Sequence, residues 1–144
     1  NCILNSVLNI KYSAAQVADI KIESNIFVPK YMNIDYGDMG VLFGNLLDNA
    51  IEANQGVDRK KRWINVSVKY EEHILIINIK NSKIRGSRRK KKGYLNHGIG
   101  LNSVKQIVEK FNGIVEVQDF GEMYEVSAIL YGICDDKDLG KSVL

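Results

Sequence analysis

The spacing of apolar residues along the chain predicts three helices. The segment 2–18 has apolar residues at intervals of three and four, which places them on one helical face: Ile3, Val7, Ile10, Ala14 and Val17. A second helix is predicted from about Asp38 to Asn54. A third apolar stripe predicts a helix that starts at the turn Gly98-Ile99-Gly100 and stops at Asn112-Gly113: Leu101, Val104, Ile107, Val108 and Phe111.

Alternation of apolar and polar residues predicts five strands. The first runs from Ile20 to about Val28 and ends at Pro29, which has no N–H to donate to a ladder. Two strands starting at Trp63 and Ile74 form an antiparallel hairpin, and a second hairpin joins 114–120 to 123–131. Each strand of the first hairpin has one apolar face, so one side of the sheet is expected to pack on a core.

This order of elements predicts an α+β fold in one domain. Strands that form one mixed, mostly antiparallel sheet, with the helices gathered on one face, make a two-layer α/β sandwich. We expect the domain to span 1–132 and a disordered tail to span 133–144. No stretch approaches the roughly 20 apolar residues that cross a bilayer, and no signal peptide opens the chain.

The net charge of +3 comes from one segment, 81–97. It holds seven basic residues and no acidic one, whereas the rest of the chain has 13 basic and 17 acidic residues. It has neither helical nor strand periodicity and is predicted to form a long loop, which in a compact domain is usually functional or disordered. Such basic runs also occur in nucleic-acid contacts. Confinement to one loop with a single aromatic, Tyr94, on an acidic body argues against that alternative.

Neither the cysteines nor the histidines form a recognisable site. Cys2 and Cys134 lie near the two ends without CxxC spacing, so free thiols are expected rather than a disulfide or a metal site. His73 opens a predicted strand and His97 lies at the end of the basic loop. Because neither is on a predicted helix, both are expected to be structural or solvent-facing.

The predicted helix from Asp38 to Asn54 carries an unusual polar stripe. At about 100° per residue, four polar side chains share one side: Asn45, Asp48, Asn49 and Glu52. Asparagine is a weaker helix former than alanine, by roughly 0.5 kcal/mol per site. Two asparagines one turn apart therefore suggest a binding role, with an ordinary solvated face as the alternative.

Two further features have the character of a phosphate site. Asn81-Ser82 lies where a buried strand enters the basic loop, and His97-Gly98-Ile99-Gly100-Leu101 is a glycine-rich turn before a helix. Glycines at a helix start let backbone N–H groups approach a phosphate, although a plain tight turn would account for them equally well. The preceding cations favour the phosphate interpretation. Neither GxxxxGK[ST] nor GxGxxG after a first strand is present, which excludes the commoner nucleotide sites.

These residues resemble the GHKL ATPase superfamily, which includes DNA gyrase, a heat-shock chaperone, mismatch-repair proteins and sensor histidine kinases. The segment NLLDNAIEA from Asn45 to Ala53 looks like its N-box, and HGIGLNSV from His97 to Val104 looks like its G2 box. The resemblance covers 1–132 and implies the Bergerat fold with a long ATP lid. Asn45, where hydrolytic members carry a Glu base, is similar to the histidine kinases. The sequence most resembles Gram-positive peptide-pheromone (quorum-sensing) receptor kinases.

The resemblance implies ATP and Mg²⁺ as cofactors. Asn49 would be the magnesium ligand, Asn45 would face the phosphates beside it, and Asn81 would accept a hydrogen bond from the adenine amino group. The phosphates would be held by the glycine-rich turn: Gly98, Ile99, Gly100 and Leu101. The usual DxGxG is here Asn81-Ser82-Lys83-Ile84-Arg85. An amide lacks the charge assistance of a carboxylate, so weaker ATP binding is expected.

The function implied is that of a protein-histidine kinase, as the catalytic domain of a two-component sensor. The γ-phosphoryl group would pass to a histidine on an upstream dimerisation helix outside this chain, and a response regulator would be an indirect partner. We expect a cytoplasmic domain of a membrane-anchored sensor, with no nucleic-acid partner. The alternatives are a GHKL protein-serine kinase of the anti-sigma type and a degenerate nucleotide-binding module.

Overall fold

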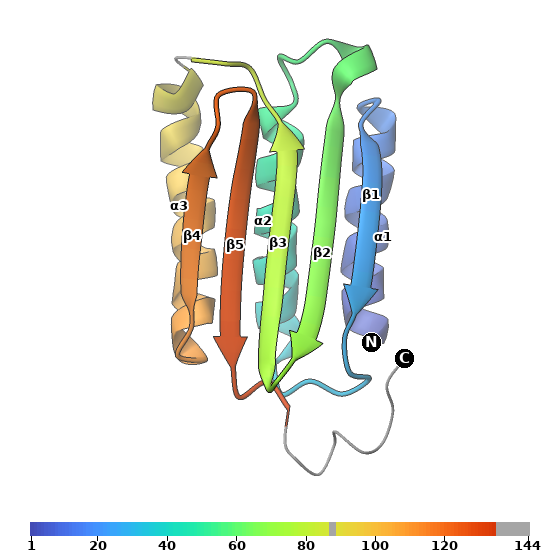
Figure 1. The fold of residues 1–144 in the computed structure, drawn as a ribbon, viewed down its shortest axis with the longest axis vertical. Helices are drawn as coiled ribbons and strands as arrows, with labels where there is room; N and C mark the ends of the chain where they lie inside the picture. Colours follow the sequence, from blue (N-terminus) through green and yellow to red (C-terminus); the bar gives the residue numbers. More distant parts are fainter. Residues whose placement is uncertain (87–88, 135–144) are drawn as a thin grey trace.

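The structure, a computed structural model, describes residues 1–86 and 89–134, and for 89–99 it gives only the course of the backbone. Three helices lie against one face of a five-stranded sheet (Figure 1). The helices are α1 (Cys2–Val17), α2 (Tyr36–Ala53) and α3 (Arg89–Lys110), with a short 3₁₀ helix, η1 (Arg59–Lys61). Over the described residues, no helix is both long and apolar enough to pass through a membrane.

The sheet is mixed, in the order β1-β2-β3-β5-β4. Its strands are β1 (Lys21–Phe27), β2 (Trp63–Glu71), β3 (Ile74–Ser82), β4 (Ile114–Asp119) and β5 (Met123–Tyr131). Only β1 and β2 pair in parallel, and the other three neighbouring pairs are antiparallel. The predicted α+β two-layer sandwich is confirmed.

The core lies between the sheet and the helices. Alternate residues of the two central hairpin strands point into it, as the sequence pattern predicts: Ile64, Val66, Val68, Leu75, Ile77 and Ile79. Ile133, assigned to the expected tail, is also fully buried, so the core extends one residue past 132. The rest of that tail from 135 onward lies outside the described residues. Neither Cys2 nor Cys134 forms a disulfide.

The buried face of α1 agrees with the predicted one only in part. Leu4, Leu8 and Ala15 are buried, and the predicted Ile3 and Val7 are partly buried against the core, whereas Ile10 and Val17 are exposed. Lys11 lies on the same side of the helix as the buried residues, because it forms an ion pair with Asp48 of α2. Apolar residues occupy more than one side of this helix, and only the partner helix decides which side is covered.

Helix α3 corrects the predicted start at Gly98. The helix already begins at Arg89, so the second half of the expected loop 81–97 is helical. Lysine, arginine and leucine are good helix formers, which explains why this segment can extend the helix despite Gly93. Gly98, Ile99, Gly100 and Leu101 therefore lie within α3 and not in a turn before it.

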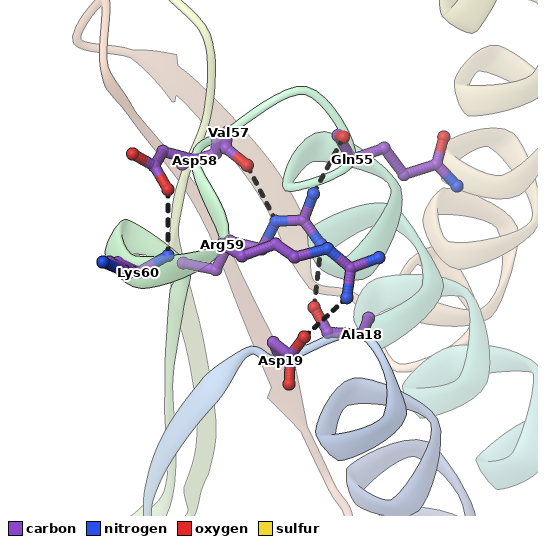
Figure 2. Close-up of polar contacts among 8 residues, drawn as sticks. Ala18, Asp19, Gln55, Val57, Asp58, Arg59 and Lys60 are labelled. Atoms are coloured by element: carbon purple, nitrogen blue, oxygen red, sulfur yellow. Dashed lines mark hydrogen bonds and ion pairs between the residues drawn. The ribbon is translucent and has the colours of Figure 1, made fainter.

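The connection after α2 is organised by Arg62. Its guanidinium donates to the carbonyl oxygens of Ala18 (2.8 Å), Val57 (2.8 Å) and Gln55 (3.0 Å), which follow the ends of α1 and α2. Figure 2 shows these carbonyls converging on one guanidinium, with the ion pair of Arg59 and Asp19 beside it. Arg62 therefore joins the ends of α1 and α2, which lie at the same end of the sandwich as the exit of β3 (Figure 1).

Candidate functional site

Asn49 is the most informative residue of the polar stripe. It lies in the C-terminal half of α2, and its side chain is only 6% exposed. Its carboxamide oxygen is buried and has no hydrogen-bond partner. An unsatisfied buried acceptor costs about 1–3 kcal/mol, and in a native structure it calls for an explanation such as a bound ion.

Tyr124 of β5 lies next to Asn49, on the side of the sheet that faces the helices. Burial raises the pKa of Tyr124, the nearby Asp119 carboxylate raises it further, and the Asn49 side chain lowers it in part. Sequence reasoning missed Tyr124, although alternation with Val126 and Ala128 places it on the inner face of the strand.

Asn45 lies one turn before Asn49 and contacts α3. It is half-buried, and a Cβ at Gly100 would lie 3.8 Å from its Cγ and its Oδ1. The two motifs that are 55 residues apart in the sequence are therefore in contact at these two residues. A side chain at position 100 would therefore lie against the Asn45 carboxamide.

The rest of the polar stripe faces a different neighbour. The Asp48 carboxylate forms an ion pair with Lys11 Nζ of α1 at 2.7 Å. The aliphatic part of the Lys11 side chain passes over Gly44. Glu52 is exposed. The structure thus divides the predicted stripe: Asn45 faces α3 and Asn49 faces Tyr124, whereas Asp48 joins α2 to α1.

Asn81 is buried near the C-terminal end of β3, with 1% exposure. Its amide nitrogen donates to the carbonyl oxygen of Ser82 at 3.0 Å. This bond uses one of the two N–H groups of the carboxamide, and the carboxamide oxygen can accept a hydrogen bond from a ligand. Asn81 is also the direct partner of Tyr124 across the β3–β5 ladder.

A second buried polar group, centred on Asn54, fixes the end of α2. Asn54 is fully buried; its amide donates to the Ala50 carbonyl at 2.9 Å, and its oxygen accepts a hydrogen bond from the Ser82 hydroxyl. Ser82 Oγ in turn accepts from the Trp63 N–H at 2.9 Å. This group was not predicted, because its three members come from α2, β2 and β3.

The segment after β3 is fastened to the β4–β5 turn. Lys83 Nζ lies 2.8 and 2.9 Å from the two carboxylate oxygens of Asp119, and the Lys83 side chain is only 9% exposed. The Arg85 guanidinium packs on Gly121, whose φ is +91°. A Cβ at position 121 would lie 2.8 Å from the Arg85 Cζ. Lys83 and Arg85, which stand where DxGxG has its two glycines, therefore hold the segment after β3 against the β4–β5 turn.

The remaining predicted residues lie in or near α3. Leu101 is half-buried in the helix. Of Gly98 and Ile99 the structure gives the helical backbone alone, and His97 and the basic run 88–92 likewise fall outside the described side chains.

His73 lies in the β2–β3 turn with φ +68°. The nine residues of β3 separate it from the exit of that strand, about 30 Å at 3.3 Å per residue.

The site can be tested for its fit to a divalent cation. Over the described part of the chain there is no group of three or more His, Cys, Asp or Glu residues that could hold a metal. Mg²⁺ does not require such a cage, because it keeps several waters and is often bound through one or two protein oxygens together with phosphates. The unpartnered oxygen of Asn49 fits that pattern.

Comparison with known proteins agrees with this geometry. The sequence model of a family described as GHKL domain matches residues 34–130. A curated relative, the probable C4-dicarboxylate sensor kinase of Bacillus subtilis (strain 168), is 32% identical over 95 residues. The match spans 59% of this chain and 18% of that protein.

Solved structures share the fold at low sequence identity. The histidine kinase AdeS of Acinetobacter baumannii superposes with a TM-score of 0.68 at 16% identity, covering 90% of this chain and 63% of that one. The nucleotide-free catalytic domain of histidine kinase ThkA gives a TM-score of 0.66 at 14% identity, covering 91% and 92%. These likenesses show that the fold is that of histidine kinase catalytic domains.

Proposed function

We propose, from the premise that this chain belongs to the GHKL domain family, that it is the ATP-binding catalytic domain of a sensor histidine kinase. It would supply the γ-phosphoryl group of ATP to a histidine on dimerisation helices of the same protein. A response regulator would receive the phosphoryl group in turn. Such a domain works where ATP is present, on the cytoplasmic side of a membrane-anchored sensor.

The observation that carries the proposal is the unpartnered oxygen of Asn49. An amide oxygen that is buried without a hydrogen-bond partner is suited to a magnesium ion bound together with phosphate oxygens. Magnesium there would neutralise charge on the phosphates. Asn45 adds a second amide one turn away, and it cannot act as a general base toward water. The pair is therefore suited to holding ATP for transfer rather than for hydrolysis.

The adenine end of the site is proposed at Asn81. One N–H of its carboxamide donates to the Ser82 carbonyl, and its oxygen would accept a hydrogen bond from an amino group on the base. Adenine carries such a donor, whereas guanine presents a carbonyl oxygen at the corresponding position. We expect ATP to bind more tightly than GTP.

The phosphate end involves Gly98, Ile99, Gly100 and Leu101. In the described conformation their N–H groups lie inside α3. We propose that ATP is bound with α3 beginning near Gly98, because only the first turn of a helix offers free N–H groups. The residues before Gly98 would then form the lid over the phosphates.

The phosphoacceptor is proposed to lie outside this chain. His73 is at the far end of β3 from Asn81, too distant for transfer within one domain. Isolated domain mixed with a separate helix pair that carries a phosphorylatable histidine should transfer labelled phosphate to that pair. Labelling of serine residues in its place would favour the protein-serine kinase alternative.

Titration calorimetry with Mg-ATP tests the proposal most directly. We expect heat of binding from the wild type and none from Asn49→Ala. Asn65→Ala, which removes an exposed asparagine from the uncovered face of the sheet, serves as the matched control. Absence of binding by the wild type at millimolar Mg-ATP would overturn the proposal.

A further inference from the structure

The outer face of the sheet, which is turned away from the three helices, carries a row of mostly apolar side chains near the start of β3. Among the described residues no helix lies on this face (Figure 1). The row crosses all five strands in register and consists of Phe27, Lys69, Ile76, Ile129 and Ile114. Its neighbours along each strand point into the core, so the row itself points outward.

Ile74 and Tyr131 extend this row toward the β2–β3 turn, where they are partners across the β3–β5 ladder. The outer patch is defined as the six apolar residues of this area: Phe27, Ile74, Ile76, Ile114, Ile129 and Tyr131. Phe27, Ile114 and Tyr131 are 58%, 57% and 45% exposed. With strands about 4.8 Å apart, the patch is about 24 Å wide and covers roughly 400 Å². Exposed apolar areas of this size are often functional.

Polar groups of opposite character border the outer patch on the two sides of β3. On the β2 side, Lys69 is a cation and Glu71 is an acceptor. On the other side, the Tyr131 hydroxyl of β5 is a donor and Glu116 of β4 is an anion. Because β2 and β5 are the two neighbours of β3, a two-fold axis along β3 brings each group of one side to its complement on the other.

We infer that the outer patch binds a second copy of this chain, packed face to face about a two-fold axis that runs along β3. Such an axis places β2 of one copy opposite β5 of the other, and β1 opposite β4. Ile76 would then face its own counterpart, and Phe27 would face Ile114 of the second copy. The apolar side chains that one copy leaves in water would cover one another, as between the sheets of a β-sandwich.

The charges at the border of the patch match under the same axis. Lys69 of one copy would lie beside Glu116 of the second copy, and Glu71 would face the Tyr131 hydroxyl. Within one copy Lys69 and Glu116 are three strands apart and two residues out of register. Their Cα atoms are therefore about 16 Å apart, beyond the reach of a direct ion pair. A partner with charge of a single sign would match only one of Lys69 and Glu71, which favours a second copy as the occupant.

The pairing is expected to be weak. About 400 Å² on each copy gives roughly 800 Å² of buried surface, less than the roughly 1,200 Å² of stable interfaces. On the other half of the outer face, Lys80 of β3 would meet its own counterpart near the axis, which confines the contact to the apolar half. Dimerisation helices of the kind proposed above would hold two copies at an effective concentration of about 1 mM, at which a weak pairing is populated.

Sedimentation equilibrium of the chain from micromolar to millimolar concentration tests the pairing. The average mass of the wild type should rise from that of a monomer toward that of a dimer. Lys69→Glu and Glu116→Lys should each weaken association by about tenfold, because each brings like charges together at both copies of the contact. The double variant Lys69→Glu/Glu116→Lys should restore the wild-type dissociation constant. Only contact between two copies can give this restoration, since the two residues are too distant to pair within one.

Controls place the same changes outside the outer patch. Lys60→Glu reverses the charge of an exposed lysine on η1 and should leave association unchanged. Ile76→Lys sets two ammonium groups face to face at the axis and should abolish association. Ile10→Lys, at an isoleucine of α1 that is 66% exposed, should not. Urea unfolding of each variant verifies that it is folded.

A wild type that stays monomeric up to millimolar concentration would contradict the inference. So would a double variant that associates no better than either single variant. Nuclear Overhauser contacts between Ile76 and residues 135–144 in a monomeric chain would assign the outer patch to that segment and overturn the inference as well. The outer patch shares no residue with the proposed nucleotide site, so loss of association and loss of Mg-ATP binding are separate results.

Discussion

Gly100 of α3 faces the carboxamide of Asn45 on α2, and a Cβ at position 100 would lie 3.8 Å from the Asn45 Cγ and Oδ1. This separation is an ordinary van der Waals contact, so alanine fits at position 100 in the structure. A glycine inside a helix is less stable than alanine by about 1 kcal/mol. Its presence at this position therefore favours a role in binding over one in folding.

Gly100→Ala should stabilise the domain and weaken ATP binding. We expect the free energy of unfolding in urea to rise by about 0.5–1 kcal/mol, because alanine is the better helix former. The added methyl group lies over the Asn45 carboxamide and should lower ATP affinity by about tenfold, the scale of one methyl group too many in a packed site. In Gly40→Ala on α2 the added Cβ meets no atom within 4 Å. This variant should raise the free energy of unfolding in the same way and leave ATP affinity unchanged.

Asn49→Ala should not destabilise the domain. Alanine removes a buried acceptor that has no partner, so the free energy of unfolding should be unchanged or higher by up to about 1 kcal/mol. Binding of Mg-ATP should be lost in the same variant. Destabilisation by more than about 2 kcal/mol would mean that the oxygen is satisfied within the fold.

Asn54→Ala should have the opposite effect on stability. This side chain is equally buried, but both ends of its carboxamide are hydrogen-bonded, to Ala50 and to Ser82. We expect a loss of about 2 kcal/mol in urea unfolding, since two buried partners lose a hydrogen bond. Together with Asn49→Ala, it separates an asparagine retained for folding from one retained for binding.

Asp119→Ala should destabilise the domain by about 2–3 kcal/mol, because it leaves the Lys83 ammonium unpaired at 9% exposure. The exposed ion pair of Arg59 and Asp19 provides the comparison. Arg59→Met should change stability by no more than about 0.5 kcal/mol, as expected for a surface pair. Equal effects of the two substitutions would mean that the Lys83 pair behaves as a surface contact.

Arg62→Lys should destabilise the domain although it keeps the charge. The guanidinium reaches three carbonyl oxygens with three different N–H groups, which an ammonium on a flexible stem cannot reproduce. We expect a loss of about 2 kcal/mol in thermal or urea unfolding. Arg59→Lys, at the neighbouring arginine that contacts only an exposed carboxylate in the described structure, is the control.

Tyr12 should make stability fall at high pH. Burial raises the pKa of Tyr12 above its ordinary value of 10.0, so between that value and the higher pKa of the folded state the native protein binds more protons than the unfolded one. Its contribution is constant below about pH 10 and is lost as the pH rises through the native pKa. Urea unfolding above pH 10 should therefore show a smaller loss in Tyr12→Phe than in the wild type.

Local patterns in the sequence were sufficient for most of the fold. The alternation in β2, β3 and β5 gives the correct inner faces, because every second residue of a strand must share one side. The amide pair on α2 was found because asparagine is out of place in mid-helix. In contrast, the glycines predict a start of α3 at Gly98, whereas the helix begins at Arg89, because the lysines that precede the glycines are good helix formers.

The sequence by itself therefore determined the α+β sandwich, the GHKL motifs and the identity of Asn45, Asn49 and Asn81 as candidates. Tertiary structure alone decided what each side chain contacts. It paired Asp48 with Lys11 and placed Tyr124 beside Asn49. It also left the carboxamide oxygen of Asn49 without a hydrogen-bond partner. The physical reason is that periodicity is fixed by neighbours along the chain, whereas burial and hydrogen-bond pairing depend on residues brought together from distant elements.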